Sequence, residues 1–79
     1  MQLNVLLFAS YAEALGAPSV AVAVRTGATV EDVLAAIRDL AGGRSLPPAR
    51  VAVNQEFAKP GYVVGSGDEI AIIPPVAGG

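Results

Sequence analysis

The side chains that carry most enzyme chemistry are scarce in this chain. It has no cysteine and no histidine, which removes thiolate nucleophiles, disulfides, the usual zinc ligands and the side chain that titrates near neutral pH. Local structure accounts for four of the acidic residues, because Glu31 and Asp32 suit a helix start and Asp68 and Glu69 suit a turn. The sequence shows no nucleophile paired with a base and an orienting group. We therefore expect that the chain is not an enzyme by itself and binds no cofactor or metal.

The remaining candidate for chemistry is the C-terminal segment 74–79, with the sequence PPVAGG. Gly78 and Gly79 have no side chains, so their backbone can approach a ligand closely inside a narrow channel. Pro74 and Pro75 have a fixed φ and favour a stiff, extended exit. A carboxylate becomes an acyl donor only when its oxygen becomes a good leaving group, which adenylation by ATP would supply. The segment therefore predicts that the terminal carboxylate of Gly79 reacts inside another protein, where water is excluded.

Hydrophobic periodicity predicts the elements that must position this tail. Alternating apolar residues indicate strands over residues 2–8, 19–25, 50–53 and 70–73, and residues 10–15 suit a short helix. A main helix begins after the N-cap Thr29 and ends at Gly42-Gly43. Its apolar face is predicted to consist of Val30, Val33, Leu34, Ile37 and Leu40. Residues 62–64 suit either a short strand or an irregular connection.

This order of elements predicts one α+β domain. Strand, strand, helix, strand, strand in 79 residues suits a mixed sheet with the main helix on one face, which is the β-grasp, or ubiquitin-like, layout. We expect the β-grasp domain to span residues 1–73 and a flexible, extended Gly-Gly tail to span residues 74–79. Strand alternation should turn one of Ile72 and Ile73 inward and leave the other available to a partner.

Charge and composition restrict the partners. The formal net charge is −2 and the five basic residues are scattered, so we do not expect nucleic-acid binding. The first residues carry no positive side chain and the apolar run there is short, so we expect neither secretion nor membrane insertion, and a cytoplasmic location. The chain is 53% hydrophobic, which in so small a domain predicts an exposed apolar patch for a protein partner.

Four segments resemble one family. The ending GDEIAIIPPVAGG (residues 67–79) is similar to that of the MoaD family, the small sulfur-carrying subunits of molybdopterin synthase. Residues 51–55 (VAVNQ), 27–37 (GATVEDVLAAI) and 8–16 (FASYAEALG) resemble the family's third strand, helix start and first connection. Two departures concern partner contacts: Ala12 stands where the family often has arginine, and Ile72 and Ile73 stand where it often has aromatic residues.

The resemblance implies a β-grasp fold and a carrier cycle. A MoeB-like, E1-like enzyme would adenylate Gly79 with ATP and magnesium, and a sulfur donor protein would convert it to a thiocarboxylate. A MoaE-like large subunit would then receive the tail and pass the sulfur to a pterin precursor, in a heterotetramer of two such pairs. The residues expected to contact these partners are Phe8, Ile73, Pro74, Pro75, Val76, Ala77 and Gly78.

Other readings of the same features stay open. The chain could carry sulfur for thiamine synthesis, as ThiS-like proteins do, or for cysteine synthesis. It could be a ubiquitin-like modifier that is joined to lysines through Gly79, or a plain interaction domain. The tail could also be an ordinary frayed terminus.

Overall fold

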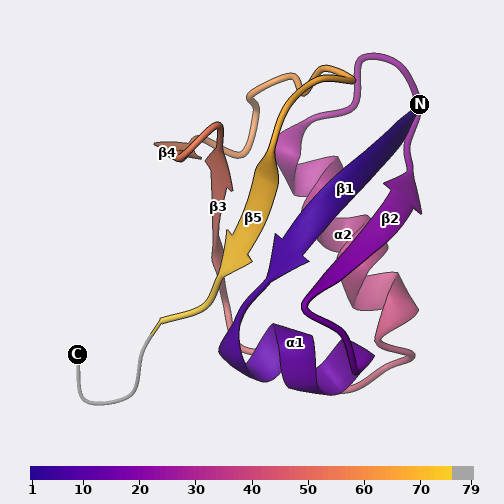
Figure 1. Ribbon diagram of the computed structural model, residues 1–79, viewed down its shortest axis with the longest axis vertical. Helices are drawn as coiled ribbons and strands as arrows, with labels where there is room; N and C mark the ends of the chain where they lie inside the picture. Colours follow the sequence, from indigo (N-terminus) through magenta and orange to yellow (C-terminus); the bar gives the residue numbers. More distant parts are fainter. Residues whose placement is uncertain (76–79) are drawn as a thin grey trace.

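The computed structural model describes residues 1–75, and Val76, Ala77, Gly78 and Gly79 lie outside the described residues. Five strands form one mixed sheet in the order β2-β1-β5-β3-β4, with two helices (Figure 1). The elements are β1 (Gln2–Leu7), α1 (Ala9–Leu15), β2 (Ser19–Ala23), α2 (Val30–Leu40), β3 (Arg50–Val53), β4 (Glu56–Ala58) and β5 (Ile70–Ile73). The predicted α+β layout is confirmed.

The last strand occupies the centre of the sheet. β1 and β2 form an antiparallel pair, and β5 lies between β1 and β3, parallel to β1 and antiparallel to β3. A two-residue turn at Asn54 and Gln55, both with positive φ, joins β3 to β4. Residues 62–64 form an irregular connection in which Val63 makes a single bridge to Thr29.

The core lies between α2 and one face of the sheet. Alternate residues of the strands point into it, and α2 contributes three side chains one turn apart. The principal members are Leu3, Val5, Leu7, Val22, Val51, Val53, Ile70 and Ile72 from the sheet and Val30, Val33 and Ile37 from α2. Ile72 is fully buried whereas Ile73 is half-buried, so the predicted division between these neighbours is confirmed.

The prediction was wrong for one residue of the buried face of α2. Leu40 is 56% exposed, and the buried position at this end of α2 belongs to Ala41. The reason is helical geometry, because Ala41 lies one turn after Ile37 on the same side, whereas Leu40 lies toward the flank. The helix does end as predicted, with Gly42 and Gly43 both at positive φ.

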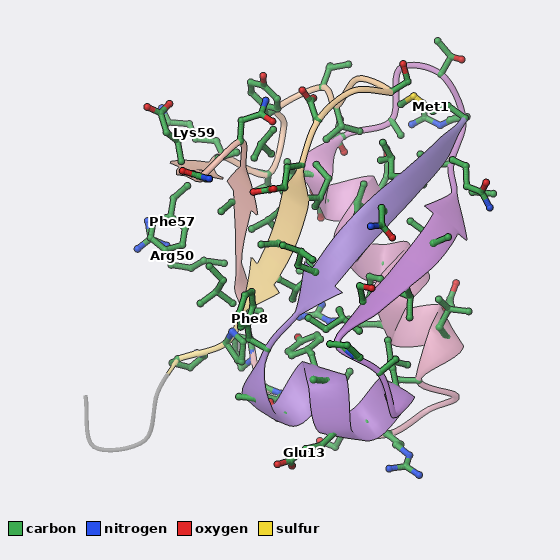
Figure 2. All side chains as sticks on the ribbon, viewed as in Figure 1. Met1, Phe8, Glu13, Arg50, Phe57 and Lys59 are labelled. Carbon is green, nitrogen blue, oxygen red and sulfur yellow. The ribbon has the colours of Figure 1, made fainter. Side chains whose placement is uncertain are left out.

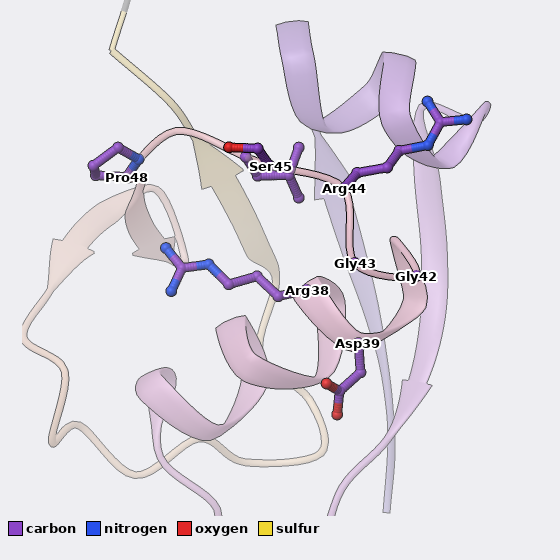
Figure 3. A pocket seen from close by; sticks show the side chains of 8 residues that line it. Arg38, Asp39, Gly42, Gly43, Arg44, Ser45 and Pro48 are labelled. Carbon is purple, nitrogen blue, oxygen red and sulfur yellow. The ribbon is translucent and has the colours of Figure 1, made fainter.

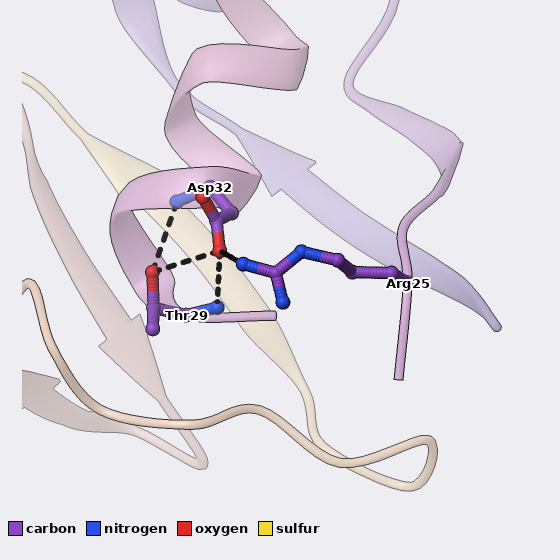
Figure 4. A network of polar contacts seen from close by, with 3 residues as sticks. All are labelled: Arg25, Thr29 and Asp32. Carbon is purple, nitrogen blue, oxygen red and sulfur yellow. Dashed lines mark hydrogen bonds and ion pairs between the residues drawn. The ribbon is translucent and has the colours of Figure 1, made fainter. Parts of the chain in front are cut away.

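The start of α2 is held by a capping box. The Asp32 backbone N–H donates to Thr29 Oγ1 at 3.3 Å, and the Thr29 N–H donates to Asp32 Oδ2 at 2.9 Å. The Arg25 guanidinium also donates to Asp32 Oδ2, at 3.0 Å (Figure 4). The backbone bond from Thr29, its hydroxyl bond and the Arg25 charge lower the pKa of Asp32. This carboxylate is therefore explained by folding rather than by catalysis.

The short helix α1 is tied to the rest of the domain through Tyr11. Its ring is fully buried, and its hydroxyl donates to the backbone oxygen of Pro47. Gly16, at a φ of 68°, then ends the helix in the left-handed conformation that glycine adopts without strain. The loop between α2 and β3 is thereby attached to α1.

Acid is expected to destabilise the fold through two hydrogen-bonded carboxylates. The Gly65 N–H, at 2.7 Å, and then the Asn54 side chain lower the pKa of Asp68, as the capping box does for Asp32. A pKa that is lower in the folded state contributes stability above the unfolded value, which is lost as pH falls through the folded value. The melting temperature should therefore fall as the pH drops through and below the ordinary aspartate pKa of 3.8.

The doubly substituted variant Asp32→Asn, Asp68→Asn tests this dependence. Its melting temperature should fall less over the same pH range than that of the parent protein, because asparagine has no carboxylate to protonate. Asp39→Asn, an exposed position on α2, is the matched control and should keep the parent's slope. Equal slopes for the double variant and the control would contradict the assignment.

Candidate functional site

The tail begins at the centre of the sheet. β5 is paired on both sides, with Leu7 of β1 and Val51 of β3 both opposite Ile72. Arg50 lies opposite Ile73, the last strand residue, and the chain leaves the sheet beside the end of β1 (Figure 1). Pro74 is buried and Pro75 is exposed. The base of the tail is thus held at a defined point by two neighbouring strands.

An apolar patch surrounds this exit on the sheet face opposite the core. The register places Leu6 beside Ala71, Ala71 beside Ala52, and Ala52 beside Phe57, so one row crosses four strands. Phe8 and Ile73 extend the row toward the tail, and the same residues line a pocket of about 220 Å³. We call Leu6, Phe8, Ala52, Phe57, Ala71 and Ile73 the open-face patch. Its two phenylalanines are 48% and 52% exposed.

Leu6, Ala71 and Ile73 are half-buried and Ala52 is buried, so the exposed apolar surface of the patch comes mainly from the two phenylalanines. Exposed apolar surface is typical of partner sites in small soluble domains. Aromatic side chains are also enriched among the residues that dominate binding energy. The open-face patch, which adjoins the tail, is therefore the candidate for the predicted apolar partner surface.

A positive charge lies at the rim of the patch. The guanidinium carbon of Arg50 lies 3.7 Å from the centroid of the Phe57 ring, in a cation–π arrangement (Figure 2). Both side chains line a second pocket of about 420 Å³, which continues along the base of the tail past Ile73, Pro74 and Pro75. An extended partner segment lying there would meet mostly apolar atoms and one arginine.

The structure brings together the described members of the predicted partner surface. Phe8 and Ile73 share the open-face patch, and Pro74 and Pro75 border the adjoining pocket. The other predicted residues are Val76, Ala77, Gly78 and the reactive Gly79, and they lie outside the described residues.

Sequence reasoning missed the middle of the patch. Leu6, Ala52 and Ala71 are ordinary strand residues, and only the pairing of β1, β5 and β3 brings them together. Phe57 gave a signal that could have been used, since an aromatic residue two positions after a tight turn, in a short strand, suits an exposed edge. The stacking of Arg50 on Phe57 depends on the β3–β4 pairing.

Among the pockets formed by the described residues, the one with the greatest volume lies away from the open-face patch. It has about 720 Å³ at the C-terminal end of α2, where Arg38, Arg44 and the two-glycine turn line it. Figure 3 shows that Arg38 and Arg44 point in different directions, so they do not converge on a common ligand. Within residues 1–75 no three acidic side chains gather as a metal site would require. No described helix has the length and apolar character needed to cross a membrane.

The sequence is similar to those of known proteins over nearly its whole length. The profile of the ThiS family matches residues 5–79. The molybdopterin synthase sulfur carrier subunit of Chlamydomonas reinhardtii is 38% identical, with all of each chain covered. The subunit of the same name from Arabidopsis thaliana is 32% identical and covers all of this chain and 84% of its own.

A solved structure agrees with these relatives. SAMP1 from Haloferax volcanii is 34% identical, with a TM-score of 0.82 over the whole of both chains. Its chain length and fold therefore match those described above. The resemblance to MoaD-like and ThiS-like sulfur carriers is confirmed, and the protein belongs to the ThiS family.

Proposed function

We propose that the protein is the sulfur carrier subunit of a molybdopterin synthase. The C-terminal carboxylate of Gly79 attacks the α-phosphorus of ATP, releases pyrophosphate and becomes an acyl-adenylate. A donor that supplies sulfur at the oxidation level of sulfide then displaces AMP, which leaves a thiocarboxylate. The thiocarboxylate sulfur then attacks a carbon of the pterin precursor and displaces an oxygen substituent, and water hydrolyses the resulting acyl–sulfur bond, which returns the carrier to its carboxylate form.

The observation that carries this proposal is the position of the tail. Because β5 is the central strand and Pro74 is buried, the tail is anchored rigidly at its base. Four residues follow Pro75, and fully extended they reach at most about 14 Å. That length suits a carboxylate that enters a partner's active site while the folded domain stays outside.

The names of the relatives support the pathway. Two proteins from different organisms that match this chain from end to end are both called molybdopterin synthase sulfur carrier subunits. Because both relatives are called subunits, their names also support a partner protein, the large subunit. We infer that a MoaE-like partner holds the active site and that two carriers and two large subunits form a heterotetramer.

The open-face patch suits both partners of the cycle. A MoeB-like activating enzyme, which uses ATP and magnesium, and the large subunit must each receive the same tail. A surface beside the tail base is therefore available to each of them in turn. Arg50 at its rim favours an acidic residue on the partner.

Intact-mass spectrometry tests the proposal. The full chain is incubated with a MoeB-like enzyme, ATP, magnesium and a sulfide source, and a mass gain equal to sulfur replacing one oxygen is expected. Omitting ATP should abolish the gain. An unchanged mass, with the same enzyme shown to act on a known carrier, would contradict the proposal.

The metabolic branch needs a separate experiment, because sulfur carriers for thiamine or cysteine would give the same mass. A deletion strain should lose molybdoenzyme activity and still grow without added thiamine or cysteine. A requirement for either compound, with molybdoenzyme activity intact, would move the carrier to that other branch.

A second candidate function is protein modification. The observation that favours it is the 34% identity to SAMP1, because a solved H. volcanii structure, 33% identical to this chain, is called small archaeal modifier protein 1. Here the activated Gly79 would form an amide with a lysine of a target protein. Tagged protein expressed in cells would then appear as larger species on a denaturing gel, and the loss of these species without Gly78-Gly79 would support the modifier function.

Substitutions in the open-face patch should weaken partner binding without unfolding the domain. Phe8→Ala and Phe57→Ala each remove a half-exposed aromatic ring, and the dissociation constant for the large subunit should rise about tenfold for each. Isothermal titration calorimetry would measure this change. Leu40→Ala, an equally exposed apolar residue on α2, is the matched control. Equal affinities for all three variants would exclude the patch as the interface.

A further inference from the structure

The two edges of the sheet differ in how they are protected against pairing with another chain. β4 has three residues, starts with Glu56, and is followed by Lys59 and Pro60. Short length, charge and proline are the usual protections of an edge strand. β2 has five residues, Ser19–Ala23, none of them charged, and within residues 1–75 it pairs only with β1. Pro18 precedes β2 and Arg25 lies two residues after it, so the β2 edge is the less protected of the two because the strand is longer and carries no charge within it.

The hydrogen bonds show which backbone groups of β2 face outward. Val24 exchanges both of its bonds with Met1, and the Leu7 N–H donates to Pro18 O at 2.8 Å. In an antiparallel pair, alternate residues direct their N–H and C=O groups toward the same neighbour. Ser19, Ala21 and Ala23 therefore direct theirs away from β1. Within residues 1–75 no other strand pairs with them, so these three residues form a free hydrogen-bonding edge.

This edge is complementary to itself. If two copies pair antiparallel about a two-fold axis at Ala21, then Ala21 faces Ala21, Ser19 faces Ala23 and Val20 faces Val22. All of these side chains are small or β-branched and uncharged, so no like charges oppose one another. The pairing would form on the order of six backbone hydrogen bonds. The two five-stranded sheets would then be continuous.

An exposed leucine lies on the same side of the molecule. Leu34 and Arg38 line a pocket with β3 residues, so that flank of α2 faces β3. Leu40 lies about 120° around the helix from Leu34, on the flank toward β2, against which α2 packs. Figure 1 shows α2 running behind β1 and β2 toward this edge. In the paired arrangement, the valines of the second copy would lie on the helix side of the sheet and cover Leu40.

We propose that the protein forms a symmetric homodimer through antiparallel β2–β2 pairing centred on Ala21. β1 separates this edge from β5, and the open-face patch extends away from it toward β4. The C-terminal end of β5 therefore lies away from the dimer interface in both copies. The inference does not depend on the sulfur-carrier function, and its failure would leave that function untouched.

Sedimentation of the full chain at concentrations up to about 1 mM tests the dimer. We expect self-association that Ala21→Pro weakens. The N–H of Ala21 points outward, so proline removes two hydrogen bonds from the dimer and none from the β1 pair. The dimer dissociation constant should rise about 30-fold. A chain that stays monomeric at every concentration would overturn the proposal.

Charged substitutions at the two-fold axis test the register of the pairing. This test does not depend on whether the proline variant folds. Ala21→Lys and Ala21→Glu should each weaken the dimer about fivefold, because each places like charges opposite one another. An equimolar mixture of the two should restore association. Asn4→Lys is the matched control, since Asn4 lies beside Ala21 on the inner strand. A dimer that neither charge at position 21 affects, or that Phe8→Asp dissolves instead, would overturn the proposal.

Discussion

Deletion of Gly78 and Gly79 is expected to abolish thiocarboxylate formation completely while leaving the fold unchanged. The reacting group is the terminal carboxylate, and after the deletion a carboxylate on Ala77 would sit about 7 Å short of its position. It would also carry a methyl group into a channel that suits glycine. Intact-mass spectrometry after reaction with the activating enzyme should show no gain in mass.

Two controls show whether the loss of reaction is due to the missing carboxylate position. The melting temperature should stay the same, because the core and the sheet are built from residues that precede the tail. A chain with one alanine added after Gly79 keeps every native residue and displaces the carboxylate, so it should also fail to react. A truncated protein that melts much earlier, or that still gains sulfur, would contradict the proposed role of Gly79.

Substitution of Ile72 and Ile73 by alanine should have opposite consequences. Ile72 is fully buried between β1 and β3, so Ile72→Ala leaves a cavity and should lower the free energy of unfolding by about 2–5 kcal/mol. A domain of this size has a total stability of about 5–15 kcal/mol, so a large part would be lost. Ile73→Ala, in the half-buried neighbour, should cost about 1 kcal/mol or less.

Urea unfolding measures the first effect and titration with the large subunit measures the second. Ile73 belongs to the open-face patch, so Ile73→Ala should weaken binding, whereas folded Ile72→Ala should bind nearly as the parent protein does. The two variants are matched because they remove the same atoms from adjacent residues. Equal losses of stability would show that the inward and outward sides of β5 are misassigned.

The fold follows largely from patterns that are local in the sequence. Alternation of apolar residues predicted a strand over residues 2–8, and Thr29 with Asp32 marked the start of α2. The resemblance to the MoaD family rests on the ending of the chain, which is also the part that implied the chemistry. The error at Leu40 arose where the pattern ended, because the last turn of a helix has few neighbours to decide which residue is buried.

The sequence by itself determined both helices, the strands β1, β2, β3 and β5 and the Gly-Gly ending, since each depends on residues a few positions apart, whereas the three-residue strand β4 was not predicted. Only the tertiary structure decided that β5 lies at the centre of the sheet and that Leu6, Ala52, Phe57 and Ala71 form one row beside the tail. It also decided that β2 and β4 are the two edges of the sheet, of which β2 is the longer and carries no charge within the strand. These features depend on strand order and register, which join residues distant in the chain and leave no periodic signal in any one segment.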